Sequence, residues 1–206
     1  VTMKVLDISE LKPPRFTRTN YQKGLNEITA AIEGITGERL VAWHRLNGKE
    51  SDKSVSKAVN GLILGALVEM GWERDWSYCP SVKSNHSTFE ASKSFDQGKS
   101  LRFAMDVASR HSNEALGYLV KGQLAKKRSS PKKFGVDAHV LLTFTEECLS
   151  WGHWNSAVYS YEKFIKNIPL VEGDISTPIW IIAIGPPNGV EISESIAGTL
   201  RIEKLN

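Results

Sequence analysis

Leu101-Arg102-Phe103-Ala104-Met105-Asp106-Val107-Ala108 is the stretch that decides the fold. Large apolar side chains occupy every second position, and small or charged side chains lie between them, which predicts a β-strand with one face against a core. Gly98 precedes this stretch and predicts a hairpin turn that joins it to a strand or loop over residues 84–93. Asp106 places a charge near the end of the strand and is the first candidate for chemistry.

Helices and strands are expected on both sides of this hairpin. The spacing of apolar residues predicts one helix from about Thr19 to Gly37 and another from about Lys53 to Met70. In the second helix, Gly61 and Gly65 are expected to let another helix approach closely. A strand is expected around residues 72–78.

Downstream of the hairpin, a helix is predicted over residues 113–127, followed by a strand over 136–144, a helix capped by Thr145, a helix around 161–168 and a buried strand over 179–184. In the first of these helices, Leu116, Leu119, Val120 and Leu124 are expected to share the buried face. The order predicts an α/β fold in which a central mixed sheet of five or six strands is flanked by helices. Residues 1–206 are expected to form one domain, with residues 186–206 as an arm or an edge strand.

Composition excludes several classes of protein. The 206 residues carry 26 basic and 23 acidic side chains, a net charge of +3, which is too weak by itself to indicate nucleic-acid binding. No apolar run reaches the length of a membrane span, and the opening 19 residues lack the apolar segment of a signal peptide. Only Cys79 and Cys148 are present, so we expect reduced thiols and a cytoplasmic protein. Zinc-site, P-loop and serine-hydrolase motifs are absent from the sequence.

Two carboxylates, Asp96 and Asp106, flank the predicted turn. We expect the hairpin to bring them together, where they would bind Mg²⁺ with the main-chain carbonyl of Val107. A bound Mg²⁺ activates water and neutralises charge on a phosphodiester. The alternative is that Asp96 is an ordinary turn residue and Asp106 points to solvent.

A basic segment follows the hairpin. Between Ala115 and Val136 there is no acidic residue, which suggests a surface for a phosphate backbone, although such loops also occur as ordinary solvated surface. The positive charges of this segment are Lys121, Lys126, Lys127, Arg128, Lys132 and Lys133.

Three local motifs resemble the BamHI, BglII and BstYI group of type II restriction endonucleases, which have the PD-(D/E)xK nuclease fold. The order of the predicted helices and strands, from about residue 21 to 186, resembles this group as well. The motifs are Phe95-Asp96-Gln97-Gly98-Lys99 followed by Phe103-Ala104-Met105-Asp106-Val107, then Ser109-Arg110-His111-Ser112-Asn113, and finally Asn155-Ser156-Ala157-Val158-Tyr159-Ser160-Tyr161-Glu162. The first resembles the catalytic hairpin of these enzymes, and the other two resemble their base-contacting segments.

The resemblance implies a restriction-endonuclease-like fold and a homodimer that cleaves palindromic double-stranded DNA. Asp96 and Asp106 would bind Mg²⁺, and water would displace the 3′ oxygen of the phosphodiester to leave a 5′ phosphate. Arg110 would contact guanine, and Asn113 or Asn155 would contact adenine. The remaining DNA contacts that we expect are His111, Ser112 and Ser156 in the base-contacting segments, and Lys126, Lys127, Arg128 and Lys132 on phosphates.

Ala108 departs from the family pattern, because these enzymes have Glu, Gln or Lys at this third catalytic position. Three explanations are open: relocation of the group to Lys99, Glu114 or Lys121, deliberate inactivation of the chain, or a natural DNA-binding protein that does not cleave. At this stage we favour deliberate inactivation, since the surrounding residues still resemble a working site.

A third functional class is also open: a protein that does not bind nucleic acid and whose basic loop is incidental. The aromatic loop at residues 151–154 is expected to contact DNA or, in the alternative, to cap the sheet or join a dimer interface.

Overall fold

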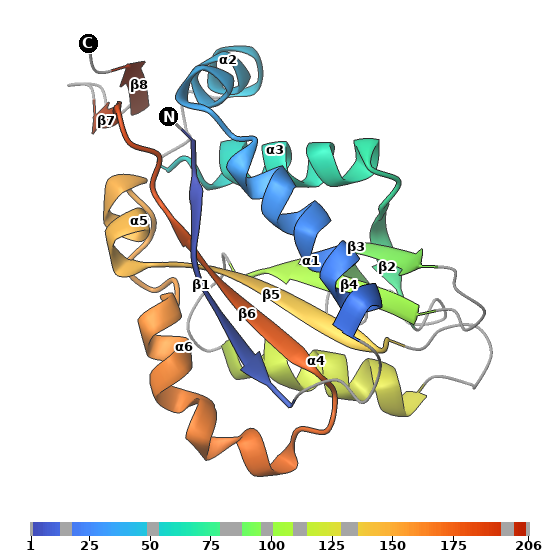
Figure 1. The fold of residues 1–206 in the computed structure, drawn as a ribbon. Helices are drawn as coiled ribbons and strands as arrows, with labels where there is room; N and C mark the ends of the chain where they lie inside the picture. The colour runs from blue at the N-terminus through green and yellow to red at the C-terminus, as the bar shows by residue number, and fades with distance from the viewer. Residues whose placement is uncertain are drawn as a thin grey trace.

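A six-stranded sheet forms the centre of the protein, and helices cover both of its faces (Figure 1). The computed structural model describes residues 2–12, 18–48, 54–78, 88–95, 101–108, 115–128, 136–194 and 200–204. The helices are α1 (Arg18–Glu33), α2 (Gly37–Asn47), α3 (Ser56–Glu69), α4 (Ala115–Arg128), α5 (Glu146–Trp151) and α6 (Tyr161–Asn167), with 3₁₀ turns at Ile168–Leu170 and Glu172–Asp174. The strands are β1 (Lys4–Leu11), β2 (Glu73–Ser77), β3 (Thr88–Phe95), β4 (Leu101–Val107), β5 (Ala138–Phe144), β6 (Ile179–Gly185), β7 (Val190–Glu194) and β8 (Leu200–Lys204).

The main sheet has the order β1-β6-β5-β4-β3-β2 and is mixed, as predicted. Strands β4, β5 and β6 are parallel to one another, whereas the pairs β1–β6, β2–β3 and β3–β4 are antiparallel. The predicted hairpin is present: Phe95 pairs with Leu101 and Ala91 with Met105. Gly98 and the rest of the turn lie outside the described residues.

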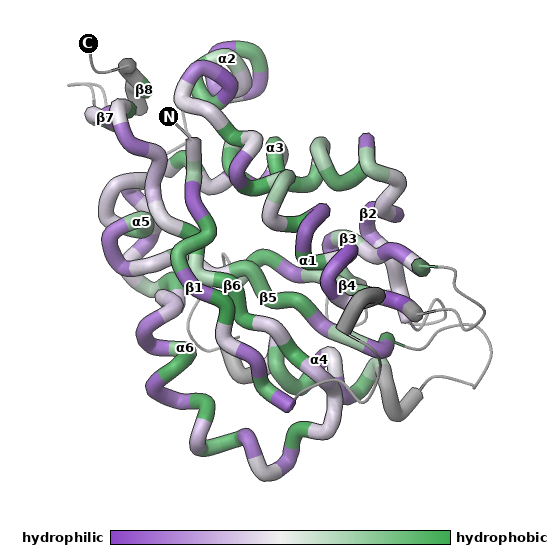
Figure 2. Tube along the Cα trace, viewed as in Figure 1, coloured by the Kyte–Doolittle hydropathy of each residue, from purple (hydrophilic) through white to green (hydrophobic). Residues whose placement is uncertain are grey.

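Each face of the sheet has its own core. On one face, α1 and α3 pack on Phe103, Met105 and Val107 of β4 and on the alternate residues of β5 and β6. On the other face, α4 and α6 cover Leu141 and Ile181. Both β5 and β6 are buried along their whole length, and Figure 2 shows that hydrophobic residues predominate within these two strands. The alternation of β4 therefore turns its even-numbered residues, including Asp106, toward α4.

The N-terminal elements differ from the prediction in two ways. Strand β1 was not predicted, because a register irregularity between Val5 and Asp7 breaks the alternation that would identify it. Gly37 was expected to end a helix, but it begins α2 instead. The side chain of Thr36 caps α2 by accepting a hydrogen bond from the Arg39 amide at 3.1 Å, so a polar cap before the glycine decides the boundary.

Helix α4 also presents a different face to the sheet. Leu119 is buried as predicted, but Val120 and Leu124 are exposed by 46% and 37%. The polar side chains of Lys121 and Gln123 point inward and are buried. The prediction from apolar spacing was wrong for this helix because the sheet beneath it carries polar groups of its own.

The chain ends in a separate hairpin, since β7 pairs with β8 and neither strand joins the main sheet. The aromatic loop holds this hairpin in place. Trp151 Nε1 donates to the Val190 carbonyl at 2.9 Å, and His153 Nε2 lies 3.1 Å from the Ile192 carbonyl. Trp154 is buried against Phe144, with ring centroids 4.2 Å apart. These contacts favour the structural interpretation of the loop.

Within the described ranges, no helix is both long and apolar enough to cross a membrane. Cys148 is a free, buried thiol, and burial raises its pKa far above the usual value, so it is unreactive. Cys79 lies outside the described residues.

The two glycines of α3 provide a test of the packing. A Cβ at Gly61 would lie 2.7 Å from Trp43 Cζ2 of α2, whereas a Cβ at Gly65 would have no atom within 4 Å. We therefore predict that Gly61→Ala lowers the free energy of unfolding by roughly 1–3 kcal/mol. Gly65→Ala, the matched control, should raise it by roughly 0.5–1 kcal/mol through helix propensity. Urea unfolding measures both, and equal effects of the two changes would contradict this packing.

Candidate active site around Asp106

Asp106 lies near the carboxyl end of β4, beneath α4, and is 2% exposed. Lys121 of α4 places its Nζ 2.7 Å from Oδ1 of Asp106. His139 of β5 places Nε2 3.2 Å from Oδ2. Each carboxylate oxygen of Asp106 therefore has a nitrogen partner from another element of the fold.

These partners decide the charge of Asp106. Burial by itself would raise the pKa of this carboxyl, but the hydrogen bond with His139 and the positive charge of Lys121 outweigh burial and lower the pKa below its ordinary value of 3.8. Asp106 is consequently ionised at neutral pH. Because an ionised carboxylate only accepts hydrogen bonds, Nε2 of His139 carries the hydrogen that points at it.

Two neighbours of Lys121 fix α4 against the sheet. Gly122 allows the helix to approach β5, because a Cβ there would lie 2.9 Å from the Cβ and Nδ1 of His139. Gln123 Oε1 accepts hydrogen bonds from the amides of Ser176 and Thr177 at 3.0 and 3.1 Å, and from both hydroxyls. These contacts join α4 to the segment that enters β6, so the position of Lys121 is defined from both sides.

Glu90 of β3 brings a second carboxylate to this end of the hairpin. Its Oε2 accepts a hydrogen bond from the Val107 amide at 3.1 Å, next to Asp106 in the chain. In the register of the hairpin, Ala91 pairs with Met105, so Glu90 and Asp106 are the next residues along their strands. Neither Glu90 nor His139 is marked by a motif or spacing in the sequence.

The donor set fits a hard divalent cation in part. Among the described residues, no group of three or more His, Cys, Asp or Glu side chains is arranged to hold a metal ion. Asp106 and Glu90 nevertheless provide two carboxylates at one strand end, and Mg²⁺ in phosphate-processing sites is commonly held by one or two carboxylates together with substrate phosphate and water. The oxygen chemistry is therefore suitable for Mg²⁺ once a phosphate is present.

Asp96, the predicted partner of Asp106, lies outside the described residues. Its neighbour Phe95 pairs with Leu101, five residues before Asp106. Five residues of strand span about 16 Å. The meeting of Asp96 with Asp106 stays a prediction, and Glu90 is the acidic residue that the described register carries to the end of β4.

Half of the predicted DNA contacts fall outside the described residues, namely Arg110, His111, Ser112, Asn113 and Lys132. Residues 126–128 form the last turn of α4, which places their backbone at the carboxyl end of that helix. Of the candidates for a relocated third group, residues 99 and 114 also lie outside the description, and Lys121 is the one that contacts Asp106.

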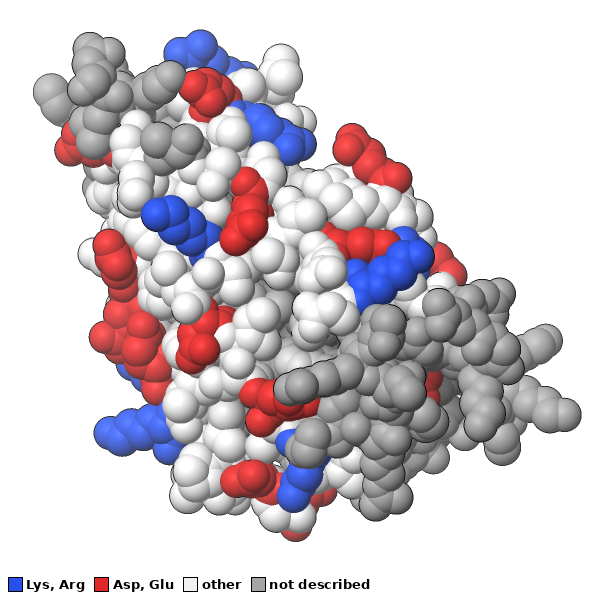
Figure 3. All heavy atoms as spheres, viewed as in Figure 1, with Lys and Arg blue, Asp and Glu red and all other residues white. Residues whose placement is uncertain are grey.

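Asn155 and Ser156 are both exposed in the loop between α5 and α6. Asn155 Oδ1 accepts a hydrogen bond from the Ala157 amide at 2.9 Å, so part of this side chain stabilises its own turn. Exposed acidic side chains surround the loop, and Figure 3 shows red side chains along the left edge of the molecule, over α5 and α6. Lys163 and Lys166 of α6 are also exposed on this surface, so it carries both signs of charge, and the contact of this loop with DNA stays a prediction.

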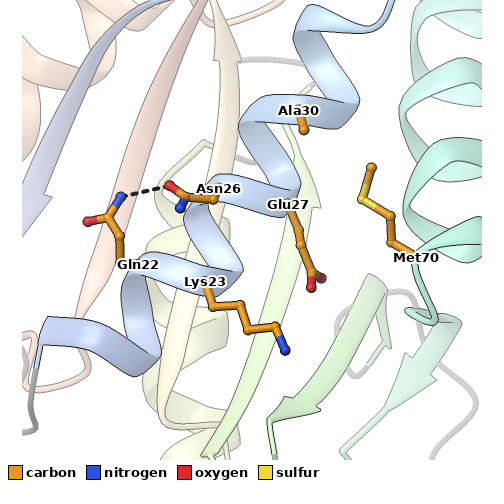
Figure 4. Close-up of a pocket in the computed structure, with 6 residues that line it drawn as sticks. All are labelled: Gln22, Lys23, Asn26, Glu27, Ala30 and Met70. Carbon is orange, nitrogen blue, oxygen red and sulfur yellow. Dashed lines mark hydrogen bonds between the residues drawn. The ribbon is translucent and has the colours of Figure 1, made fainter.

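A hollow of about 460 Å³ lies elsewhere, on the outer side of α1, and is lined by Gln22, Lys23, Asn26, Glu27, Ala30 and Met70 (Figure 4). Its carboxylate, Glu27, accepts hydrogen bonds from Lys93 Nζ at 2.7 Å and from Trp72 Nε1 at 2.8 Å. Lys93 also donates to the Met70 carbonyl. These groups satisfy one another and join α1 to α3 and β3, so we assign them a structural role.

Comparison with known proteins gives a family match and matches to solved structures. The family model "Restriction endonuclease BglII/BglIII" matches residues 15–184, well over half of the chain. The crystal structure of restriction endonuclease BglII complexed with a DNA 16-mer superposes with a TM-score of 0.56 at 10% identity, covering 99% of this chain and 91% of that chain. At this identity the structural match establishes the fold alone. No curated protein matches the sequence.

Replacement of Asp106 tests the charge network. Asp106→Asn leaves Lys121 buried without its counter-charge, so we predict a loss of about 3 kcal/mol of unfolding free energy at pH 7. Because the folded-state pKa of Asp106 lies below 3.8, its stabilisation is complete above about pH 4 and is lost as the pH falls through the folded value. The difference between the wild type and the variant should therefore shrink below pH 4.

Urea unfolding between pH 7 and pH 3 measures this difference. Asp174→Asn, which changes an exposed carboxylate, is the control. A difference between wild type and Asp106→Asn that stays constant over the whole range would show that Asp106 is not held ionised by its neighbours.

Proposed function

Since the chain belongs to the BglII/BglIII family of restriction endonucleases, we propose that it cleaves double-stranded DNA at a palindromic site with Mg²⁺, and that Asp106 is the centre of its catalytic site. The observation that carries this proposal is the ionised carboxylate near the carboxyl end of β4, held by Lys121 and His139. A buried charge surrounded by several titratable groups is typical of catalytic sites.

The carboxylates of Asp106 and Glu90 would hold the metal. When bound, Mg²⁺ supplies a more acidic water and positive charge for the phosphoryl oxygens. In the proposed reaction, the oxygen of a water molecule forms a bond to phosphorus and the bond from phosphorus to the 3′ oxygen breaks. One proton of the water leaves to solvent, and the departing 3′ oxygen takes one up, which yields a 5′ phosphate and a 3′ hydroxyl.

The chain's own residues prepare this site for the reaction. His139 and Lys121 keep Asp106 in one orientation, and the carboxylate is buried. A preorganised carboxylate does not have to reorient when the substrate binds, and this is a principal source of catalysis in such sites.

DNA recognition is assigned to two segments at the two ends of α4. Residues 110–113 precede it, and Arg110 and Asn113 have the donor and acceptor pattern for guanine and adenine edges. The basic residues 126–128 form the last turn of α4 and Lys132 follows it, and all four would contact phosphates. Asn155 and Ser156, in the loop between α5 and α6, are the remaining candidates in this proposal.

A homodimer follows from a palindromic site, because two copies related by a twofold axis present the same surface to each half-site. The exposed Val120 and Leu124 of α4 support self-association, since the two apolar side chains lie one helical turn apart on the same exposed face.

Ala108 favours one alternative, a DNA-binding protein that does not cleave. Its methyl group is 2% exposed and packs among apolar side chains of the α4 face, so β4 itself supplies no third polar group. Specific DNA binding with no cleavage in any divalent cation would establish this alternative.

Plasmid cleavage in Mg²⁺ separates the possible carboxylate ligands. We predict that Asp106→Asn and Glu90→Gln each reduce the cleavage rate by on the order of 100-fold or more, because each removes a negatively charged metal ligand. Asp96→Asn tests the sequence prediction directly and should have the smaller effect. Loss of cleavage in Asp96→Asn together with normal cleavage in Glu90→Gln would restore the original assignment.

Neutralisation of the basic segment tests its phosphate contacts. Replacement of Lys126, Lys127, Arg128 and Lys132 by Gln should weaken binding to specific and non-specific DNA alike and reduce the slope of log affinity against log salt by about 0.9 for each lost phosphate contact. Fluorescence anisotropy at several salt concentrations measures the slope. A fourfold substitution of exposed lysines elsewhere (Lys4, Lys57, Lys163 and Lys166) is the control, and an unchanged slope in the basic-segment variant would contradict the assignment.

A further inference from the structure

Helix α4 packs on the end of β4 at Ala108, the position at which the resemblance led us to expect a polar catalytic side chain. Ala108 lies two residues beyond Asp106 and belongs to the same buried apolar cluster as Tyr118 and Leu119 of α4. Its amide donates to the Leu142 carbonyl at 2.8 Å, so the backbone at this position still belongs to the sheet. The helix covers the place that a longer side chain at position 108 would occupy.

Lys121 lies one helical turn after Tyr118, so it extends from the same side of α4 toward Asp106. Its side chain is 9% exposed, and its Nζ is held by Asp106 Oδ1 on one side and by the face of the Phe89 ring, 4.6 Å from the centroid, on the other. A lysine held between a carboxylate and an aromatic ring has a defined position, unlike a lysine on the surface.

The helix is arranged around this inward lysine. Gly122 permits the close approach to His139, and Gln123 joins α4 to the start of β6. The same rotation of the helix leaves Val120 and Leu124 in solvent. An apolar stripe facing the sheet would be the ordinary arrangement, and departures of this kind concentrate at functional sites.

We propose that Lys121 is the third catalytic group of this nuclease, so that α4 supplies the positive charge which β4 lacks at Ala108. This inference rests on the proposed function. During the displacement, negative charge increases on the phosphoryl oxygens and on the departing 3′ oxygen, and a cation beside Asp106 stabilises it. Lys121 neither gains nor loses a proton in this role, and the proton exchange with solvent described above is unchanged.

The competing interpretation is that Lys121 only neutralises Asp106. A residue of this kind would act through Asp106, whose charge and orientation it fixes, so its loss would impair both stability and cleavage. The two roles differ in rescue, because a lysine placed at position 108 replaces a lost catalytic cation near the phosphate but not the lost partner of Asp106 on α4. A catalytic cation affects the cleavage rate in a protein that is folded and binds DNA normally.

Three measurements on each variant test the role of Lys121. They are the rate of single-turnover cleavage in Mg²⁺, the DNA affinity without divalent cation, and thermal unfolding. Lys121→Met should reduce cleavage by about 100-fold or more while DNA affinity changes by no more than about threefold. Lys121→Gln, which keeps a hydrogen-bond donor near Asp106 but no charge, should lose cleavage similarly and decides the question if Lys121→Met does not fold. Lys166→Met, on the exposed side of α6, is the matched control and should cleave normally.

A second variant tests whether position or charge matters. Ala108→Lys in the Lys121→Met background places a lysine on the strand. The double variant should cleave about tenfold or more faster than Lys121→Met alone. Cleavage within about threefold of wild type in a folded Lys121→Met or Lys121→Gln variant would overturn the inference, as would a folded, DNA-binding double variant with no recovery. If the wild-type chain neither binds nor cleaves DNA, the proposed function fails instead.

Discussion

The ion pair between Asp106 and Lys121 is the interaction on which the arrangement of this end of the molecule depends. An unpaired carboxylate that is 2% exposed would be very unfavourable, so its partners must be in place whenever the protein is folded. These partners come from α4 and β5, which are distant in sequence. The pair therefore specifies the rotation of α4 and its distance from the sheet, and Gly122 and Gln123 are consequences of that requirement.

Local sequence patterns predicted the sheet well and α4 poorly, for one physical reason. The alternation in β4 and the apolar run of β6 both indicate burial against apolar neighbours. Both strands are present in the structure, as predicted. The rule fails for α4 because the surface beneath it carries Asp106 and His139, which need polar partners. Strand β1 was missed for a related reason, since its register irregularity disrupts the period of two.

The site was predicted in part. Asp106 was identified because a charge in an alternating strand is conspicuous, and Lys121 was among three candidates for the missing group. His139 could not be found from spacing, because it reaches Asp106 through the parallel register of β4 with β5. Glu90 could have been found, because a hairpin that turns around Gly98 pairs the end of β4 with the start of β3. The prediction for Asp96 stays untested, since this residue lies outside the described ranges.

The proposed role of Lys121 would place the positive charge of the site on a helix instead of on the strand that carries Asp106. Transition-state stabilisation depends on where a charge lies relative to the phosphate, and the backbone element that carries it is irrelevant. A small residue at position 108 allows α4 to pack closely over β4, and that close packing is what brings Lys121 within 2.7 Å of Asp106. A long side chain on the strand would hold the helix away and prevent the same contact. Ala108 and Lys121 are therefore two parts of one packing arrangement between α4 and β4.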